Sequence, residues 1–164
     1  PDKKHIAHVV AIGALKWNDL KSETTRDIIF DWDDLLSMKG NSGPYIQYAT
    51  VRAKSVLRKA ALEEFYPGFG DDSWKLDKDE MSLVRHLDRF TEVVEQAAKE
   101  FAPHHLATYL FELAQRFNGF YNTHPIINAE NSDARERRCT LTQVAAKVLE
   151  YGLSLLGIQT PEEM

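Results

Sequence analysis

Long segments whose apolar residues recur at helical spacing constrain the fold of this chain more than any other feature of its sequence. The clearest segment begins at Pro44, which suits a first helical turn, and continues to about Phe65. At about 100° per residue, its apolar side chains fall on one arc: Ile46, Ala49, Ala53, Val56, Leu57 and Ala60. We expect further helices over 5–20, 32–38, 79–101, 103–121 and 133–156. Because strands do not alternate with helices and no repeat is present, the sequence predicts an all-α fold built on an antiparallel helical bundle.

The size and composition of the chain are typical of one domain with a short appendage. Its 164 residues can build a single core but not two full domains. A lone cysteine, Cys139, excludes a disulfide framework, and no apolar run approaches the roughly 20 residues that a membrane span needs. The chain begins with Pro1 instead of an initiator methionine, which suggests a piece of a longer protein. We therefore expect a cytoplasmic, monomeric protein with no membrane contact.

The basic charge of the chain is concentrated in one segment. A net charge of -5 and a pI near 5.7 argue against a general nucleic-acid binder, because cations supply most non-specific affinity for phosphate. Between residues 44 and 62, however, the chain carries no acid and these cations: Arg52, Lys54, Arg58 and Lys59. Such a patch can engage a short RNA segment, although most patches of this kind are solvated helix faces.

Tyr45, Tyr48, Arg52 and Lys59 form a stripe beside the apolar arc of this segment. Proteins that bind single-stranded RNA stack bases on aromatic rings or guanidinium planes and hold the backbone with cations. The stripe therefore fits an RNA-binding surface. It equally fits tyrosines at the edge of a core with bonded hydroxyls, and an Arg52 that pairs with an acid across the bundle.

Residues that could serve catalysis or bind a metal are few and poorly spaced. His5 and His8 resemble a degenerate nucleotide-binding His-x-Gly-His signature, but neither the glycine nor an upstream strand is present. His104 and His105 are adjacent, so on a helix they point about 100° apart and cannot chelate one ion. The aspartates between residues 31 and 34 precede a helical turn, where capping explains them. We predict no catalytic and no metal-binding residue.

Three stretches of the chain resemble arginyl-tRNA synthetases. They are Phe30-Asp31-Trp32-Asp33, then Gly40-Asn41-Ser42-Gly43-Pro44-Tyr45-Ile46-Gln47-Tyr48-Ala49-Thr50-Val51-Arg52, and Leu149-Glu150-Tyr151-Gly152-Leu153-Ser154-Leu155-Leu156-Gly157-Ile158 with Pro161-Glu162-Glu163-Met164. The resemblance covers nearly the whole chain. It implies that residues 1–43 are the end of the catalytic region and its connecting loop, and that residues 44–164 are an α-helical anticodon-binding domain.

The same resemblance implies a binding site. Residues that match the following ones line or adjoin the family's site for unstacked anticodon bases: Tyr45, Tyr48, Arg52, Tyr121, Met164 and Asn41. Arg52 would contact phosphate, and the loop that holds Asn41 would lie beside the site. Pro125 is a departure, since some members carry another aromatic residue there. Every arginine codon has a central guanine, so the central anticodon cytosine is the base that such a site should read.

The function implied by the resemblance is recognition of arginine tRNA within a class I synthetase, which attaches arginine to its tRNA using ATP with the help of magnesium. This chain alone would lack the active site and hold no cofactor. Its partners would be arginine tRNA and the missing catalytic domain in cis. The alternative is a helical protein–protein interaction module, which the acidic balance and the amphipathic helices favour. A small-molecule-binding bundle enzyme would need inward-facing polar residues, whereas the predicted inward arcs are apolar.

Overall fold

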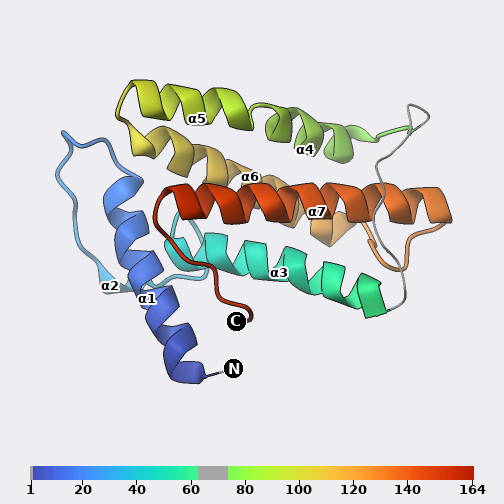
Figure 1. Ribbon diagram of the computed structural model, residues 1–164, viewed down its shortest axis with the longest axis horizontal. Coiled ribbons are helices and arrows are strands. Elements are labelled where there is room, and N and C mark those ends of the chain that lie inside the picture. Colours follow the sequence, from blue (N-terminus) through green and yellow to red (C-terminus); the bar gives the residue numbers. More distant parts are fainter. Residues whose placement is uncertain (1, 63–73) are drawn as a thin grey trace.

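The computed structural model describes residues 2–62 and 74–164, and the regular elements in these ranges are helices (Figure 1). They are α1 (Lys3–Leu20), α2 (Trp32–Leu35), α3 (Gly43–Leu62), α4 (Lys78–Asp88), α5 (Phe90–Lys99), α6 (Pro103–Thr123) and α7 (Ser132–Leu155). These ranges contain no strand, so the predicted all-α class is confirmed. The end of the helix predicted over 44–65 falls outside the described residues. No helix described here is long and apolar enough to cross a membrane.

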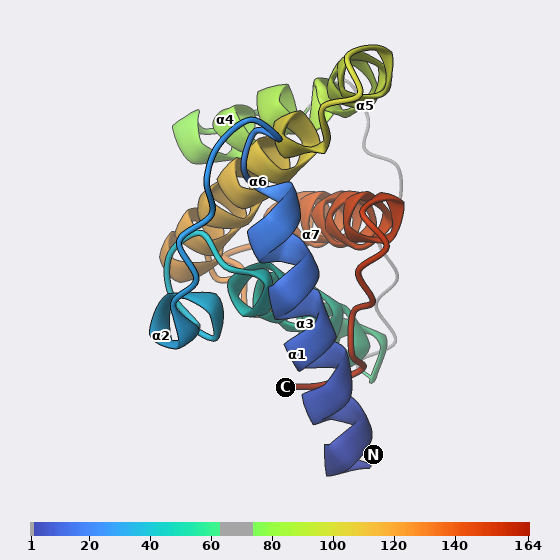
Figure 2. The ribbon, with the colours of Figure 1, turned by 90° about the vertical axis from the view of Figure 1, so that its left-hand side faces the viewer.

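The centre of the molecule is a bundle of α3, α6 and α7 (Figure 1). α3 and α7 run in opposite directions and pack side by side, as predicted for an antiparallel bundle. α4 and α5 follow one another along α6. α1 packs across the start of α3 (Figure 2). The C-terminal tail, residues 157–164, leaves α7 and runs toward α1 and α3, so that both ends of the chain lie at the same side of the bundle.

The hydrophobic core lies where the faces of these helices meet. The apolar arc predicted for α3 is confirmed, because Ile46, Ala49 and Ala53 are fully buried. α6 contributes two large aromatic side chains to the same core, Phe117 and Phe120. α6 and α7 approach closely at Gly152, where an added Cβ would lie 2.5 Å from a methyl carbon of Leu110. A side chain at that position would push the two helices apart.

Local capping signals place most of the helix ends. Asp2 begins α1 by accepting a hydrogen bond from the backbone N–H of Lys4 at 3.0 Å. The side chain of Asp31 accepts two backbone N–H groups at the start of α2, which confirms a capping role for this aspartate. α2 ends at Leu35, earlier than the predicted boundary at residue 38. Gly157 has a φ of +69° and follows the end of α7, as expected for a C-terminal stop.

The segment predicted as one helix over 79–101 is two helices. α4 ends at Asp88, and α5 begins at Phe90 after the intervening Arg89. The backbone N–H of Arg89 bonds to the carbonyl of His86 at 3.3 Å, a tight turn that interrupts the α-helical ladder. No proline or glycine marks the break in the sequence, so periodicity alone did not reveal it. Both halves pack on α6.

Buried charges tie α4 to α7. The carboxylate of Glu80 is fully buried and accepts from the Nε atoms of Arg137 at 3.0 Å and Arg138 at 3.3 Å. It also accepts the backbone N–H of Asp77, which completes a capping box. Arg138 pairs in turn with Glu130 at 2.8 Å. Because a buried carboxylate is tolerated only with such partners, the cluster determines where α4 lies on the bundle.

Candidate nucleic-acid interface

The predicted stripe of Tyr45, Tyr48 and Arg52 lies along one face of α3. The helix begins just before it, and the hydroxyl of Ser42 accepts the backbone N–H of Tyr45 at 3.2 Å. Both tyrosines and Arg52 are half-buried. Tyr45 and Arg52 contact α6, so the stripe marks the edge of the interface between α3 and α6.

The guanidinium group of Arg52 contacts two tyrosine rings that come from different helices. Its central carbon lies 4.7 Å from the ring centroid of Tyr48 on α3 and 4.9 Å from that of Tyr121 on α6. These distances are typical of cation–π contacts, which are strongest when solvent is partly excluded. Nη2 of Arg52 also donates to the hydroxyl of Tyr48 at 3.2 Å. The arrangement makes one continuous layer of planar groups across two helices.

Asn118 joins the tyrosine stripe to Arg52. Its Oδ1 accepts from Nη1 of Arg52 at 2.9 Å, and its Nδ2 donates to the hydroxyl of Tyr45 at 3.0 Å. Among the described residues, the side-chain partners of Arg52 are thus an amide and a hydroxyl, not the acid across the bundle that was considered above. Asn118 was not among the site residues predicted from the sequence. Its place three residues before Tyr121, on the same face of one helix, was the signal that could have found it.

A pocket of about 370 Å³ opens beside this layer. It is lined by Tyr48, Val51, Arg52, Ser55, Val56, Arg58, Lys59, Tyr121, Glu163 and Met164. Tyr121 is 37% exposed and Met164 is 40% exposed, so both can be reached from solvent. Three cations and one acid therefore surround a space with two aromatic rings and a thioether. Such a lining can accept a flat, polar ring and a neighbouring anion.

Four of the six predicted site residues line this pocket, and two do not. The ring of Tyr45 lies 5.9 Å from that of Phe111 at the helix interface, and its hydroxyl is bonded to Asn118. Asn41 faces α1, where its Oδ1 accepts from Nε1 of the buried Trp17 at 2.9 Å. Tyr45 is therefore linked to the pocket residue Arg52 only through Asn118, and Asn41 holds the loop before α3 against α1.

A second pocket of about 260 Å³ adjoins the first. The two pockets share three lining residues, Val56, Lys59 and Tyr121. Pro125 lines the second pocket. The position at which the sequence departs from the family pattern therefore lies next to the candidate site.

The other side chains considered for chemistry do not line this pocket. His5 and His8 are exposed on α1. His105 bonds to the carboxylate of Glu100 at 2.7 Å, and this hydrogen bond lowers the pKa of Glu100. Across residues 2–62 and 74–164, no group of three or more His, Cys, Asp or Glu side chains is placed to hold a metal ion.

Comparison with known proteins finds similar sequences and structures. The family model described as "DALR anticodon binding domain" matches residues 46–164. A protein named arginine–tRNA ligase from Pectobacterium carotovorum is 41% identical over 159 residues, which are 97% of this chain and 27% of that protein. Its counterpart from Escherichia coli (strain K12 / DH10B) is 43% identical over the same share of both chains. The chain thus spans about a quarter of the length of these curated relatives.

Solved structures agree with these matches. The arginyl-tRNA synthetase of Thermus thermophilus has a TM-score of 0.91 and 38% identity, and the match covers 100% of this chain and 28% of that one. The arginyl-tRNA synthetase of Plasmodium falciparum has a TM-score of 0.84 and 27% identity, with 99% and 28% covered. The resemblance to arginyl-tRNA synthetases is therefore confirmed. Because the family model matches well over half of its residues, this chain belongs to the DALR anticodon binding domain family.

Proposed function

We propose that this chain recognises the anticodon of arginine tRNA as part of an arginyl-tRNA synthetase. One observation carries the proposal: Tyr48, Arg52, Tyr121 and Met164, which come from α3, α6 and the C-terminal tail, line a single pocket. The relatives named arginine–tRNA ligase supply the identity of the tRNA. Membership in a family of anticodon binding domains supplies the part of the tRNA that is bound.

The pocket suits a base that has left its stack. The tyrosine rings and the thioether of Met164 offer flat and polarisable surfaces for the face of a base. Ser55 and the hydroxyl of Tyr48 offer polar atoms for its edge. The central cytosine is the base that all arginine anticodons share, so it is the one whose exchange should matter most.

The cations around the pocket have different surroundings. Arg58 and Lys59 are exposed at its rim, where they are free to meet phosphates. Arg52 is half-buried against two rings and bonded to Asn118. We assign phosphate contact mainly to Arg58 and Lys59, and we assign to Arg52 the additional work of holding Tyr48 and Tyr121 in register.

The first part of the chain suits contact with a larger protein. Residues 28–38 expose several apolar side chains, among them Ile29, which is 90% exposed, and Trp32, which is 62% exposed. We propose that residues 1–43 end the catalytic region, that residues 44–164 are the anticodon-binding domain, and that this apolar surface meets the catalytic domain in cis. The complete enzyme would be a cytoplasmic monomer that uses ATP and magnesium, with neither bound by this chain.

The exposed apolar surface also favours a second candidate, a helical module that binds another protein. That reading accounts for Ile29 and Trp32. It does not account for the contacts of the Arg52 guanidinium group with the rings of Tyr48 and Tyr121. A protein partner captured without any measurable preference among tRNAs would favour this second candidate.

The test is a titration of the chain with an arginine tRNA transcript and with the same transcript carrying another base at the central anticodon position, at low and moderate salt. We expect tighter binding of the native transcript, and we expect Tyr48→Ala to remove the preference. Tyr151→Ala is the matched control, because Tyr151 is an exposed tyrosine on α7 that does not line the pocket. Equal binding of both transcripts by the unmodified chain would contradict the proposal.

A further inference from the structure

Gln47 lies next to Tyr48 on α3 but points the other way, into the space between α1 and the C-terminal tail. Its side chain is fully buried. Its Nε2 donates to the backbone carbonyl of Gln159 in the tail at 2.7 Å and to that of Val9 in α1 at 3.3 Å. One amide group therefore connects three segments that are far apart along the chain.

The helices are shaped around this amide. A Cβ added at Gly13 of α1 would lie 2.5 Å from Nε2 of Gln47. A Cβ added at Gly43 would lie 2.7 Å from the carbonyl oxygen of Gly13. Two glycines thus let α1 and α3 cross closely at this point, and a side chain at Gly13 would collide with the Gln47 amide.

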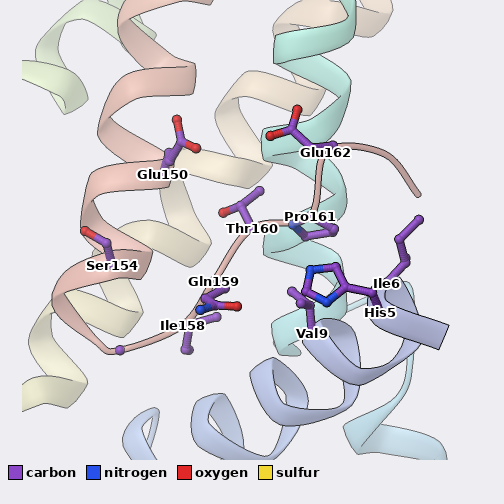
Figure 3. A pocket seen from close by; sticks show the side chains of 11 residues that line it. His5, Ile6, Val9, Glu150, Ser154, Ile158, Gln159, Thr160, Pro161 and Glu162 are labelled. Atoms are coloured by element: carbon purple, nitrogen blue, oxygen red, sulfur yellow. The ribbon is translucent and has the colours of Figure 1, made fainter. Parts of the chain in front are cut away.

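The tail has open space on its other side. A cavity of about 540 Å³ lies between the tail, α1 and α7, and Figure 3 shows its lining. His5, Ile6 and Val9 face it from α1, and Glu150 and Ser154 face it from α7. The tail is incompletely packed at this cavity, although Ile158 and Pro161 are buried, so the groups that donate hydrogen bonds to it from α3 and α1 help to fix its course.

Those groups are few, and Gln47 is the one nearest the end of the tail. Lys16 donates to the carbonyl of Gly157 at 2.5 Å, and the backbone N–H of Ile158 bonds to Leu153 at 2.9 Å. Between described residues, no hydrogen bond holds the tail beyond Gln159. Gln47 is accordingly the last polar tether before Glu163 and Met164 enter the pocket.

Burying the Gln47 amide is partly unfavourable for the free energy of folding. Oε1 of Gln47 is buried and has no hydrogen-bond partner among the described residues. An unsatisfied buried acceptor is unfavourable, so an apolar side chain of similar length would fill the same space without it. The amide is therefore better explained by what its Nε2 holds than by a contribution to stability.

From this geometry we infer that Gln47 is a positioning residue of the pocket: its amide fixes the C-terminal tail so that Met164 lies opposite Tyr48 and Tyr121. The inference rests on the proposed function, because it concerns how the same pocket reads a base. It assigns specificity to a residue that does not itself line the pocket.

The experiment compares variants of the whole 164-residue chain in the titration with native and central-base-exchanged arginine tRNA transcripts. Gln47→Met keeps the length of the side chain and removes both donors. We expect the preference for the native transcript to fall about tenfold, while binding of the exchanged transcript and its salt dependence stay as they were. Thr50→Val is the matched control, because Thr50 is an equally buried polar residue of α3 whose hydroxyl bonds within its own helix to Ile46.

Gln47→Glu separates positioning from packing. The carboxylate has the same shape but would face two carbonyl oxygens, so its pKa should rise and the ionised form should release the tail. Protonation restores one donor. We therefore expect the base preference of this variant to be weak at about pH 8 and to recover as the pH falls to about 6, while the unmodified chain shows no such recovery.

Met164→Ala distinguishes the failure of this inference from the failure of the proposed function. If Met164→Ala loses the preference and Gln47→Met keeps it, the tail matters but Gln47 does not position it, and the inference is overturned. If both variants keep the preference, Met164 takes no part in reading the base, and the inference is overturned together with that part of the proposed site. If the unmodified chain shows no preference, the proposed function itself is wrong.

Discussion

The guanidinium carbon of Arg52 on α3 lies 4.9 Å from the centre of the Tyr121 ring on α6. This contact joins the two helices. The contact depends on the plane of the guanidinium group and not on charge alone. It also shields part of the Arg52 side chain from solvent. Arg52 therefore belongs to the architecture of the pocket as much as to its charge.

Arg52→Lys should weaken tRNA binding even though it keeps the charge. An ammonium group cannot contact both rings and donate to Asn118 and Tyr48 in the same plane. We expect the Kd for arginine tRNA to rise about tenfold, or roughly 1.4 kcal/mol, in a titration at fixed salt. Arg85→Lys, at an exposed position on α4, is the control. Native affinity in Arg52→Lys would show that charge alone matters at this site.

Asn118→Ala should destabilise the fold, whereas Asn118→Asp should leave stability nearly unchanged and weaken tRNA binding. Alanine leaves the guanidinium of Arg52 and the hydroxyl of Tyr45 without their partner, so we expect the unfolding free energy to drop by about 1–3 kcal/mol. Aspartate keeps an acceptor for Arg52, so the fold should stay near its original stability. Its negative charge beside the pocket should nevertheless repel phosphate. Urea denaturation measures the stability of both variants, and tRNA titration measures their binding. Tight tRNA binding by Asn118→Asp would contradict the prediction.

Glu80→Gln should destabilise the fold without changing the pocket. The substitution leaves the buried side of Arg138 and the neighbouring Arg137 without their carboxylate. Breaking a buried ion pair from one side typically costs about 3–5 kcal/mol in unfolding free energy. Glu95→Gln, at an exposed site on α5, should change stability by less than about 0.5 kcal/mol. Equal urea midpoints for the two variants would show that the cluster around Glu80 is not needed for stability.

Stability should fall as the pH drops below the ordinary pKa of histidine, because of His86. Burial lowers the pKa of His86 from its usual 6.5, although its bond to the Tyr109 carbonyl opposes the shift. The unfolded chain therefore takes up the proton first as the pH falls. The contribution of His86 is present above pH 6.5 and is lost as the pH falls toward the folded pKa.

Thermal unfolding followed from pH 7 downward measures this effect. In His86→Gln, which keeps a donor for Tyr109, the decline just below pH 6.5 should be absent. The lowered pKa values of Asp77 and Glu100 place their own contributions at more acidic pH, so they do not mask the histidine. An unchanged decline in His86→Gln would assign it to another group.

Much of the fold follows from signals between near neighbours along the chain. Helical spacing predicted the segments that became α1, α3, α6 and α7, because an amphipathic face is a local pattern. Asp2 and Gly157 marked helix ends for equally local reasons, a side-chain cap and a left-handed backbone angle. The break at Arg89 escaped detection because it serves the fit of α4 and α5 to α6, which no local signal encodes.

The candidate site also has residues that were predicted from the sequence and partners that only the structure revealed. Tyr48 and Arg52 share a face of α3 by spacing alone, and the resemblance to arginyl-tRNA synthetases added Tyr121 and Met164. The partners of these residues could not be read from either source. Asn118 became a bridge only because α6 packs against α3, and Asn41 turned to Trp17 only because α1 lies across the loop before α3.

Residue order thus accounts for the helices, their caps and the tyrosine and arginine stripe, since each depends on contacts within a few residues. The packing of α6 on α3 and the course of the tail past Gln47 account for the pocket. These depend on side-chain fit and hydrogen bonds between distant segments, such as Gln47 and Gln159. These interactions contribute to stability only after the helices have packed together.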